Sequence, residues 1–203
     1  MLLYIFLIPL IFYALLLMWL IPLGYTVKSF FTLLTAPGQF FRIAVNRQQR
    51  RNHALEHATV NVLEETYGQT HLAGYAVEDG FIIKGFFDST LIYQAALVGL
   101  ERIQNGEKEL ALHKRCGTSL AASNLVTSLI FIILLFSTHR ASIWTVLLAL
   151  LGGSFVGSLL GPLTQRYITT ATDLNSVEIM GYLPSLGQVK IYTKQRETEF
   201  LVE

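Results

Sequence analysis

The sequence predicts a multi-pass α-helical membrane protein, with about three spans and a small cytoplasmic α+β unit. Charged residues make up 14% of its 203 residues and hydrophobic residues 52%. That charged share is well below the quarter usual in soluble domains. Three stretches contain no charge, at 1–23, 120–137 and 143–163. Each approaches or exceeds the roughly 20 residues that cross a bilayer core of about 30 Å.

The first span is expected over 1–24. It has no basic residues ahead of it and no small-residue cleavage site, so it predicts an anchor and not a removable signal peptide. Residues 25–45 mix aromatic and aliphatic side chains with polar ones, and Pro37-Gly38 is expected to break them into two parts. This pattern predicts an interfacial amphipathic segment. A bent fourth span is the alternative, which two basic residues in the segment disfavour.

The charge distribution predicts the orientation. The loop between the second and third spans holds only one basic residue, Arg140. Five basic residues follow the first span: Lys28, Arg42, Arg47, Arg50 and Arg51. By the positive-inside rule the N-terminus lies outside, and 46–118 and the tail, 164–203, lie in the cytoplasm of a plasma or thylakoid membrane. The net charge of +1 gives no reason to expect a nucleic-acid partner. With Cys116 as the lone cysteine, an intrachain disulfide is excluded.

The polar region 46–118 predicts a compact α+β unit. Its expected elements are a helix over 53–67 capped by Asn52 and ended by Gly68, a hairpin around Asp79-Gly80, a helix from Asp88 or Ser89 to about Gln104, and a short helix over EKELALHKRC. A unit of about seventy residues is small for an independent core, so we expect it to pack on the membrane helices or on the tail.

A two-span membrane hairpin is expected over 119–163. Gly153, Gly157 and Gly161 recur every four residues and line one helix face, which allows close packing. Packing against the preceding span of the same chain is favoured over a dimer interface. The tail carries two short β-like runs, VKIYT and EFLV.

The candidate chemistry begins with the H-x-x-E-H pattern in RNHALEHATV. His53 and His57 are four residues apart, so one helix face can present both imidazoles to a metal ion. Glu56 lies beside that face, where it can take a proton from a metal-bound water without being a ligand. This is the reversed zincin arrangement.

A second motif, HKRC, supplies further candidate ligands. His113 and Cys116 are three residues apart, a spacing common in zinc sites, and both motifs are expected just outside the bilayer on the same side. Mixed histidine and cysteine ligation favours zinc, with another divalent metal as the alternative. Three protein ligands would leave a position for water, whereas all four would close the tetrahedron.

Together HALEHATVNVLEE and HKRCGTSL, the latter leading directly into an apolar span, resemble the YqhQ-type bacterial membrane proteins. The later QRYITTATDLNSVEI is similar to the segment that follows their last spans. The chain is more similar still to a short uncharacterised cyanobacterial-type group that carries HALEHAT. The resemblance covers about residues 50–180 and implies no settled reaction. The functional positions that it implies are His53, Glu56, His57, His113, Arg115, Cys116, Gly117 and Thr118.

Two functions follow from these patterns. The first is a zinc-dependent membrane hydrolase, peptidase-like, with Glu56 as general base and an extended peptide as substrate. The alternative is a non-enzymatic accessory or assembly factor of a photosynthetic or respiratory membrane complex, in which the metal is structural. Besides the lipid bilayer, the expected partners are therefore either a peptide substrate or the subunits of such a complex.

Overall fold

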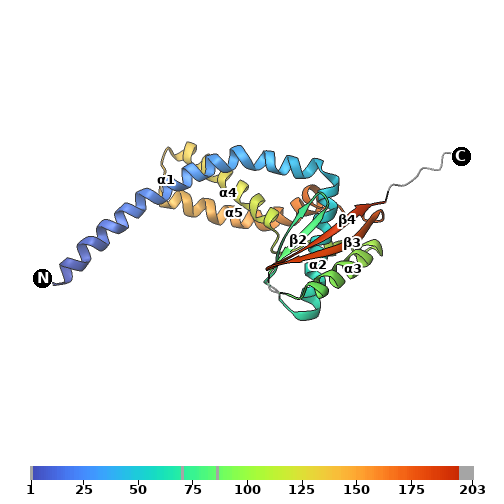
Figure 1. The fold of residues 1–203 in the computed structure, drawn as a ribbon. Helices are drawn as coiled ribbons and strands as arrows, with labels where there is room; N and C mark the ends of the chain where they lie inside the picture. The colour runs from blue at the N-terminus through green and yellow to red at the C-terminus, as the bar shows by residue number, and fades with distance from the viewer. Residues whose placement is uncertain (1, 70, 86, 197–203) are drawn as a thin grey trace. The chain divides into compact units, whose positions relative to one another are not determined.

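The computed structural model describes residues 2–69, 71–85 and 87–196. The chain divides into two compact units, which are described separately. One contains residues 1–39 and 119–161, and the other contains residues 40–118 and 162–203. Figure 1 shows the order of the elements along the chain.

Long apolar helices make up the first unit. Within the described residues, three helices are long and apolar enough to cross a membrane, which confirms the three expected spans as helices. These three helices are α1 (Leu2–Val45), α4 (Gly117–Thr138) and α5 (Ile143–Thr164). Aromatic contact joins α1 to α4, where the ring centroids of Tyr25 and Phe131 lie 4.9 Å apart.

The expected break at Pro37-Gly38 is wrong, because α1 continues through both residues to Val45. An interior proline costs a helix about 3 kcal/mol. Helix growth adds one backbone hydrogen bond per residue, so the rest of the 44-residue helix on both sides of Pro37 outweighs that cost. Residue 24 is therefore not a helix end, and the interfacial position of 25–45 stays a prediction.

Close packing of α4 and α5 confirms the expected role of the spaced glycines. A Cβ atom on Gly153 would lie 1.8 Å from Thr127 Oγ1, and one on Gly157 would lie 2.1 Å from Ser123 Oγ. Real side chains do not approach so closely, so only glycine allows these two helices to meet as they do. The glycine face is thus used within the chain.

The second unit is built on an antiparallel sheet. In the described part of this unit, four strands pair in the order β1-β2-β4-β3. The strands are β1 (Ala73–Val77), β2 (Gly80–Lys84), β3 (Val177–Ser185) and β4 (Gln188–Gln195). The predicted hairpin at Asp79-Gly80 is confirmed as β1–β2. VKIYT lies in β4 as a strand, whereas EFLV lies outside the described residues. The tail therefore completes the sheet, which explains how so small a unit acquires a core.

Two helices, α2 (Arg47–Tyr67) and α3 (Ser89–Gln104), cover one face of this sheet (Figure 1). That face presents Phe81 and Ile83 from β2, and Val189 and Ile191 from β4, all buried against the helices. The predicted start of the second helix at Asp88 is confirmed, since its side chain accepts hydrogen bonds from the backbone N–H groups of Thr90 and Leu91.

The predicted cap Asn52 is wrong, although Gly68 ends the helix as expected. The helix begins six residues earlier, and Asn46 is its cap, accepting a hydrogen bond from Gln49 N–H. Asn52 is instead buried. Its amide donates to the carbonyls of Val77 and Glu78 and accepts from Thr193 Oγ1, so it ties the helix to the sheet.

The expected helix over EKELALHKRC is present only as a short 3₁₀ turn, η1 (Lys108–Ala111). HKRC follows it as a turn, in which Cys116 N–H donates to His113 O at 3.3 Å. A π-helical turn, η2 (Gln165–Thr169), follows α5 and leads toward β3.

Candidate metal centre

A buried polar segment of α2 forms the centre of the site. All ten residues of RNHALEHATV, 51–60, are buried. Polar and charged side chains are rarely buried unless they are paired or bind a metal. His53, Glu56 and His57 each expose 8% or less of their surface. Their surroundings must therefore satisfy them, and those surroundings come from segments distant in the sequence.

Both imidazoles are oriented by backbone carbonyls. His53 Nδ1 lies 2.9 Å from Thr169 O, and His57 Nδ1 lies 2.7 Å from Ala111 O. A carbonyl oxygen can only accept, so in each ring the Nδ1–H is the donor. The neutral rings then carry a lone pair on Nε2. Metal-binding histidines are held in this way, with the other nitrogen bonded to a carbonyl or carboxylate.

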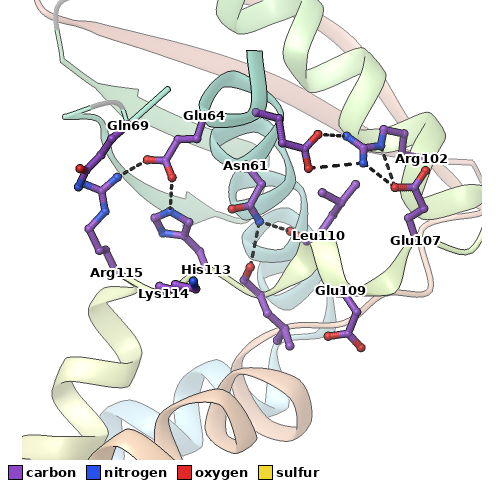
Figure 2. Close-up of a pocket in the computed structure, with 12 residues that line it drawn as sticks. Asn61, Glu64, Gln69, Arg102, Glu107, Glu109, Leu110, His113, Lys114 and Arg115 are labelled. Carbon is purple, nitrogen blue, oxygen red and sulfur yellow. Dashed lines mark hydrogen bonds and ion pairs between the residues drawn. The ribbon is translucent and has the colours of Figure 1, made fainter. Parts of the chain in front are cut away.

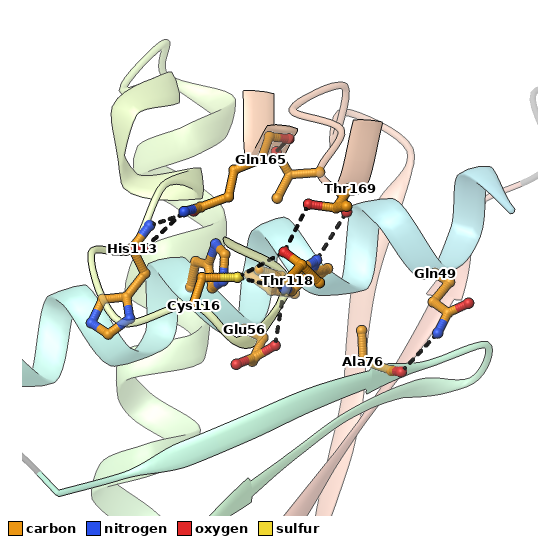
Figure 3. Close-up of polar contacts among 12 residues, drawn as sticks. Gln49, Glu56, Ala76, His113, Cys116, Thr118, Gln165 and Thr169 are labelled. Atoms are coloured by element: carbon orange, nitrogen blue, oxygen red, sulfur yellow. Dashed lines mark hydrogen bonds and ion pairs between the residues drawn. The ribbon is translucent and has the colours of Figure 1, made fainter. Parts of the chain in front are cut away.

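Cys116 completes a three-residue group with these histidines. It lies immediately before α4, beside Thr118 (Figure 3), and is buried. Its Sγ is 3.5 Å from His53 Nε2. One ligand atom from each of His53, His57 and Cys116 lies within 4.8 Å of the other two. Tetrahedral zinc with its ordinary bond lengths separates a sulfur and a nitrogen ligand by about 3.6 Å. The group could therefore hold a metal ion.

Glu56 lies beside this group and lacks a hydrogen bond on one oxygen. Its Oε2 is 3.8 Å from His53 Nε2, and among the described residues it has no hydrogen-bond partner. A buried carboxylate oxygen without a donor is costly. A hydrogen-bond donor at this oxygen, such as a water bound to a metal, would satisfy it.

The charges of the group also call for a cation. With a divalent ion bound, both imidazoles would be neutral ligands, and the ion would balance the charges of a Cys116 thiolate and a Glu56 carboxylate. Burial raises the pKa of the Cys116 thiol, but its hydrogen bonds to His53 and His57 outweigh burial and lower that pKa to about 4. Burial also raises the pKa of Glu56. The pKa of His53 is raised, because the hydrogen bond to Cys116 and the nearby negative charges outweigh its burial.

His113 is not brought into the three-residue group. Its ring centroid lies 5.9 Å from that of His57, and its Nε2 lies 3.5 Å from Glu64 Oε2. Burial lowers the pKa of His113. Arg115 also pairs with Glu64. His113 thus faces a carboxylate, and its role as a fourth ligand stays a prediction.

A cavity of about 910 Å³ lies against His113 (Figure 2). Its wall is largely charged: Arg102 pairs with Glu65 at 2.5 Å and with Glu107 at 2.6 Å. This cavity does not include His53 or Cys116. Arg102 and Arg115 are paired with carboxylates of this wall, and the cavity does not contain the three-residue group, so it is not the better candidate for chemistry.

A smaller groove of about 200 Å³ is lined by His53, Thr118 and residues 74–76 of β1, among others. Gly74 also lies directly against Glu56. A Cβ atom on Gly74 would lie 2.5 Å from Glu56 Oε1. The glycine therefore leaves room for the carboxylate between the strand and the histidines.

Several residues that support the site carry no metal-binding signature. Gln165 holds the backbone of His113, because its Oε1 accepts from His113 N–H and its Nε2 donates to His113 O. Thr118 Oγ1 lies 3.0 Å from Cys116 Sγ and 3.2 Å from Thr169 Oγ1. Asn61 donates to two carbonyls that flank Ala111. Thr118 and the QRYITT segment were signalled in the sequence only through the family resemblance, and Asn61 was not singled out.

Comparison with known proteins agrees with the cyanobacterial-type group. A protein of Picosynechococcus sp. (strain PCC 7002), described as uncharacterised, is 32% identical over 148 residues, which cover 62% of this chain and 67% of that protein. No solved structure matches the chain. The likeness to YqhQ-type proteins stays a resemblance of motifs.

The family model for the domain of unknown function DUF6391 matches residues 48–181. That range includes α2 with its histidines, HKRC, both later apolar helices and QRYITT. The chain therefore belongs to the DUF6391 family.

Proposed function

We propose that this protein is a zinc-dependent membrane hydrolase with a peptidase-like reaction. His53, His57 and Cys116 hold the metal, and Glu56 is the general base. The observation that carries the proposal is the unsatisfied Glu56 Oε2, buried beside three convergent ligand atoms. A catalytic zinc site typically has three protein ligands and one open position, whereas a structural site is closed by four.

Bound zinc would act as a Lewis acid and lower the pKa of a coordinated water. Glu56 would take one proton from the attacking water and deliver it to the leaving amine, so that one water is consumed for each peptide bond cleaved. The raised pKa of Glu56 favours this exchange, because the carboxylate then gains and loses a proton closer to neutral pH.

The alternative is an accessory or assembly factor in which the metal is structural. It requires a fourth ligand, and His113 is the candidate. The contact of its Nε2 with Glu64 favours the three-ligand site.

The deciding experiment substitutes Glu56→Gln in the full chain and measures zinc content together with complementation of a deletion strain. We expect bound zinc to be retained and function to be lost. Glu65→Gln is the matched control, since it makes the same change on the same helix at a residue paired with Arg102. Full function in Glu56→Gln would refute catalysis and support the structural alternative.

We also propose that the N-terminus lies outside and the α+β unit in the cytoplasm, as the basic residues after the first span favour. Leu186, in the turn between β3 and β4, exposes 98% of its surface. A Leu186→Cys protein in intact cells should resist a membrane-impermeant maleimide and react with it after lysis. Labelling in intact cells would refute this orientation.

A further inference from the structure

Three residues of β1, Gly74, Tyr75 and Ala76, line the groove that includes His53. Thr193 N–H donates to Asp79 O, and Gly85 N–H donates to Gly187 O. Since backbone direction alternates along an antiparallel strand, the odd-numbered residues of β2 point toward β4 and the even-numbered ones toward β1.

The register then fixes which residues of β1 point outward. Gly74 pairs with Ile83 and Ala76 with Phe81, both odd-numbered. The N–H and C=O groups of Gly74 and Ala76 therefore point away from β2. Gln49 Nε2 donates to Ala76 O at 3.2 Å, as an outward carbonyl requires. In the described residues no strand pairs with this side of β1, because β1 is at the end of the sheet order.

The opposite edge of the sheet is different. By the same alternation, Pro184 in β3 occupies an outward position, opposite Val189. A proline there removes a donor and blocks pairing by a further strand. The β1 edge has no such residue, and it offers the Gly74 N–H, the Gly74 C=O and the Ala76 N–H. Gln49 covers the Ala76 carbonyl and so marks one end of the open stretch.

We propose that an extended polypeptide segment pairs with the outward edge of β1 at Gly74 and Ala76 and so enters the groove that holds His53. The inference rests on the proposed hydrolase and names its substrate class. A segment in this position lies beside Glu56, because Glu56 is in contact with Gly74. Backbone pairing recognises extended chains of many sequences, since it uses main-chain groups.

Photocrosslinking tests the position of the segment. The full chain carries Glu56→Gln, so that binding is measured without cleavage, and the probe is reduced, carboxymethylated α-lactalbumin, a permanently unfolded polypeptide. A benzoylphenylalanine replaces Tyr75 on β1 or, in the matched control, Leu183 on β3. Both residues are exposed. We expect at least five-fold more crosslinking from position 75. Equal yields, or a higher yield from position 183, would overturn the proposal.

A backbone substitution tests the pairing itself. Ala76→Pro removes one outward N–H and leaves the β1–β2 pairing intact, as Pro184 does on the other edge. We expect the Kd for the fluorescein-labelled probe to rise about five-fold, as a hydrogen bond of about 1 kcal/mol implies. An unchanged Kd in a folded variant overturns the pairing. If the variant does not fold, the crosslinking yields decide.

The two proposals fail separately. Crosslinking at position 75 without cleavage of the probe by the unmodified protein would refute the hydrolase and leave the binding edge. Cleavage of the probe without crosslinking at position 75 would refute the binding edge and leave the hydrolase.

Discussion

The substitution Gly74→Ala, which adds a single methyl group, should slow catalysis and leave metal binding unchanged. The added Cβ would lie 2.5 Å from Glu56 Oε1 and 2.8 Å from Cγ and Cδ, whereas ordinary contact begins at 3.4 Å. The carboxylate must therefore retreat by about 0.9 Å, and a displacement of about 1 Å can lower a rate about 100-fold. We expect Gly74→Ala to lower kcat for the carboxymethylated α-lactalbumin probe by about that factor, measured beside zinc content by mass spectrometry.

Zinc content should stay unchanged in Gly74→Ala, because the three atoms nearest to that Cβ all belong to Glu56 and not to a proposed ligand. Gly38→Ala is the control: it also adds a methyl group, but it meets nothing within 4 Å. Normal kcat in zinc-loaded Gly74→Ala would refute the role of Glu56 as a positioned base. Loss of zinc would show instead that Glu56 is needed to hold the metal.

Three further predictions concern the site and the helices. In metal-free protein the thiolate absorbance of Cys116 at 240 nm should persist as pH falls, with a midpoint near 4 and not near the ordinary 9.0. The stability that the thiolate contributes should therefore be complete above pH 9 and be lost as pH falls toward 4. A midpoint near 9 would contradict this. His113→Ala should bind zinc with an affinity within about three-fold of the unmodified protein, measured by competition with a chelator. A loss of affinity of about 100-fold, as for a ligand or its close support, would make His113 a fourth ligand. Gly153→Ala should lower the free energy of unfolding by about 1–3 kcal/mol, because the added Cβ forces α5 away from Thr127. The control Gly152→Ala should lower it less, since its Cβ meets Ile130 at 3.4 Å. Equal thermal stabilities of the two variants would refute the close approach of the helices.

Local patterns predicted most of the elements. Uncharged stretches of sufficient length gave all three apolar helices, and Asp79-Gly80 between apolar runs gave the hairpin. The cap at Asn52 was wrong because Asn46 offers the same chemistry six residues earlier. Nothing local shows that Asn52 instead bonds to Thr193, 141 residues away. Pro37 does not break the helix because helix formation is cooperative and α1 continues on both sides of it.

For the site, spacing in the sequence predicted the chemistry but not the full geometry. The four-residue spacing of His53 and His57 requires only a helix, and the three-residue group with Cys116 fits that prediction. What sequence could not give is the set of contacts that depends on the packing of distant segments. Gly74 has no reactive group, yet its missing Cβ makes room for Glu56. Thr169 acts through a backbone carbonyl, which no side-chain motif reveals.

Two strands of the sheet precede α4 and α5 in the sequence and two follow them, which affects the order in which the fold forms during synthesis. The strand β2 ends at Lys84 and its partner β4 begins at Gln188, with α4 and α5 between them. At the usual rate of 5–20 residues per second, the ribosome needs about 5–20 s to make that interval. The carbonyl that orients His53 comes from Thr169, so it too is made after both apolar helices. A nascent chain therefore cannot orient its first histidine until those helices are complete, and the site matures late.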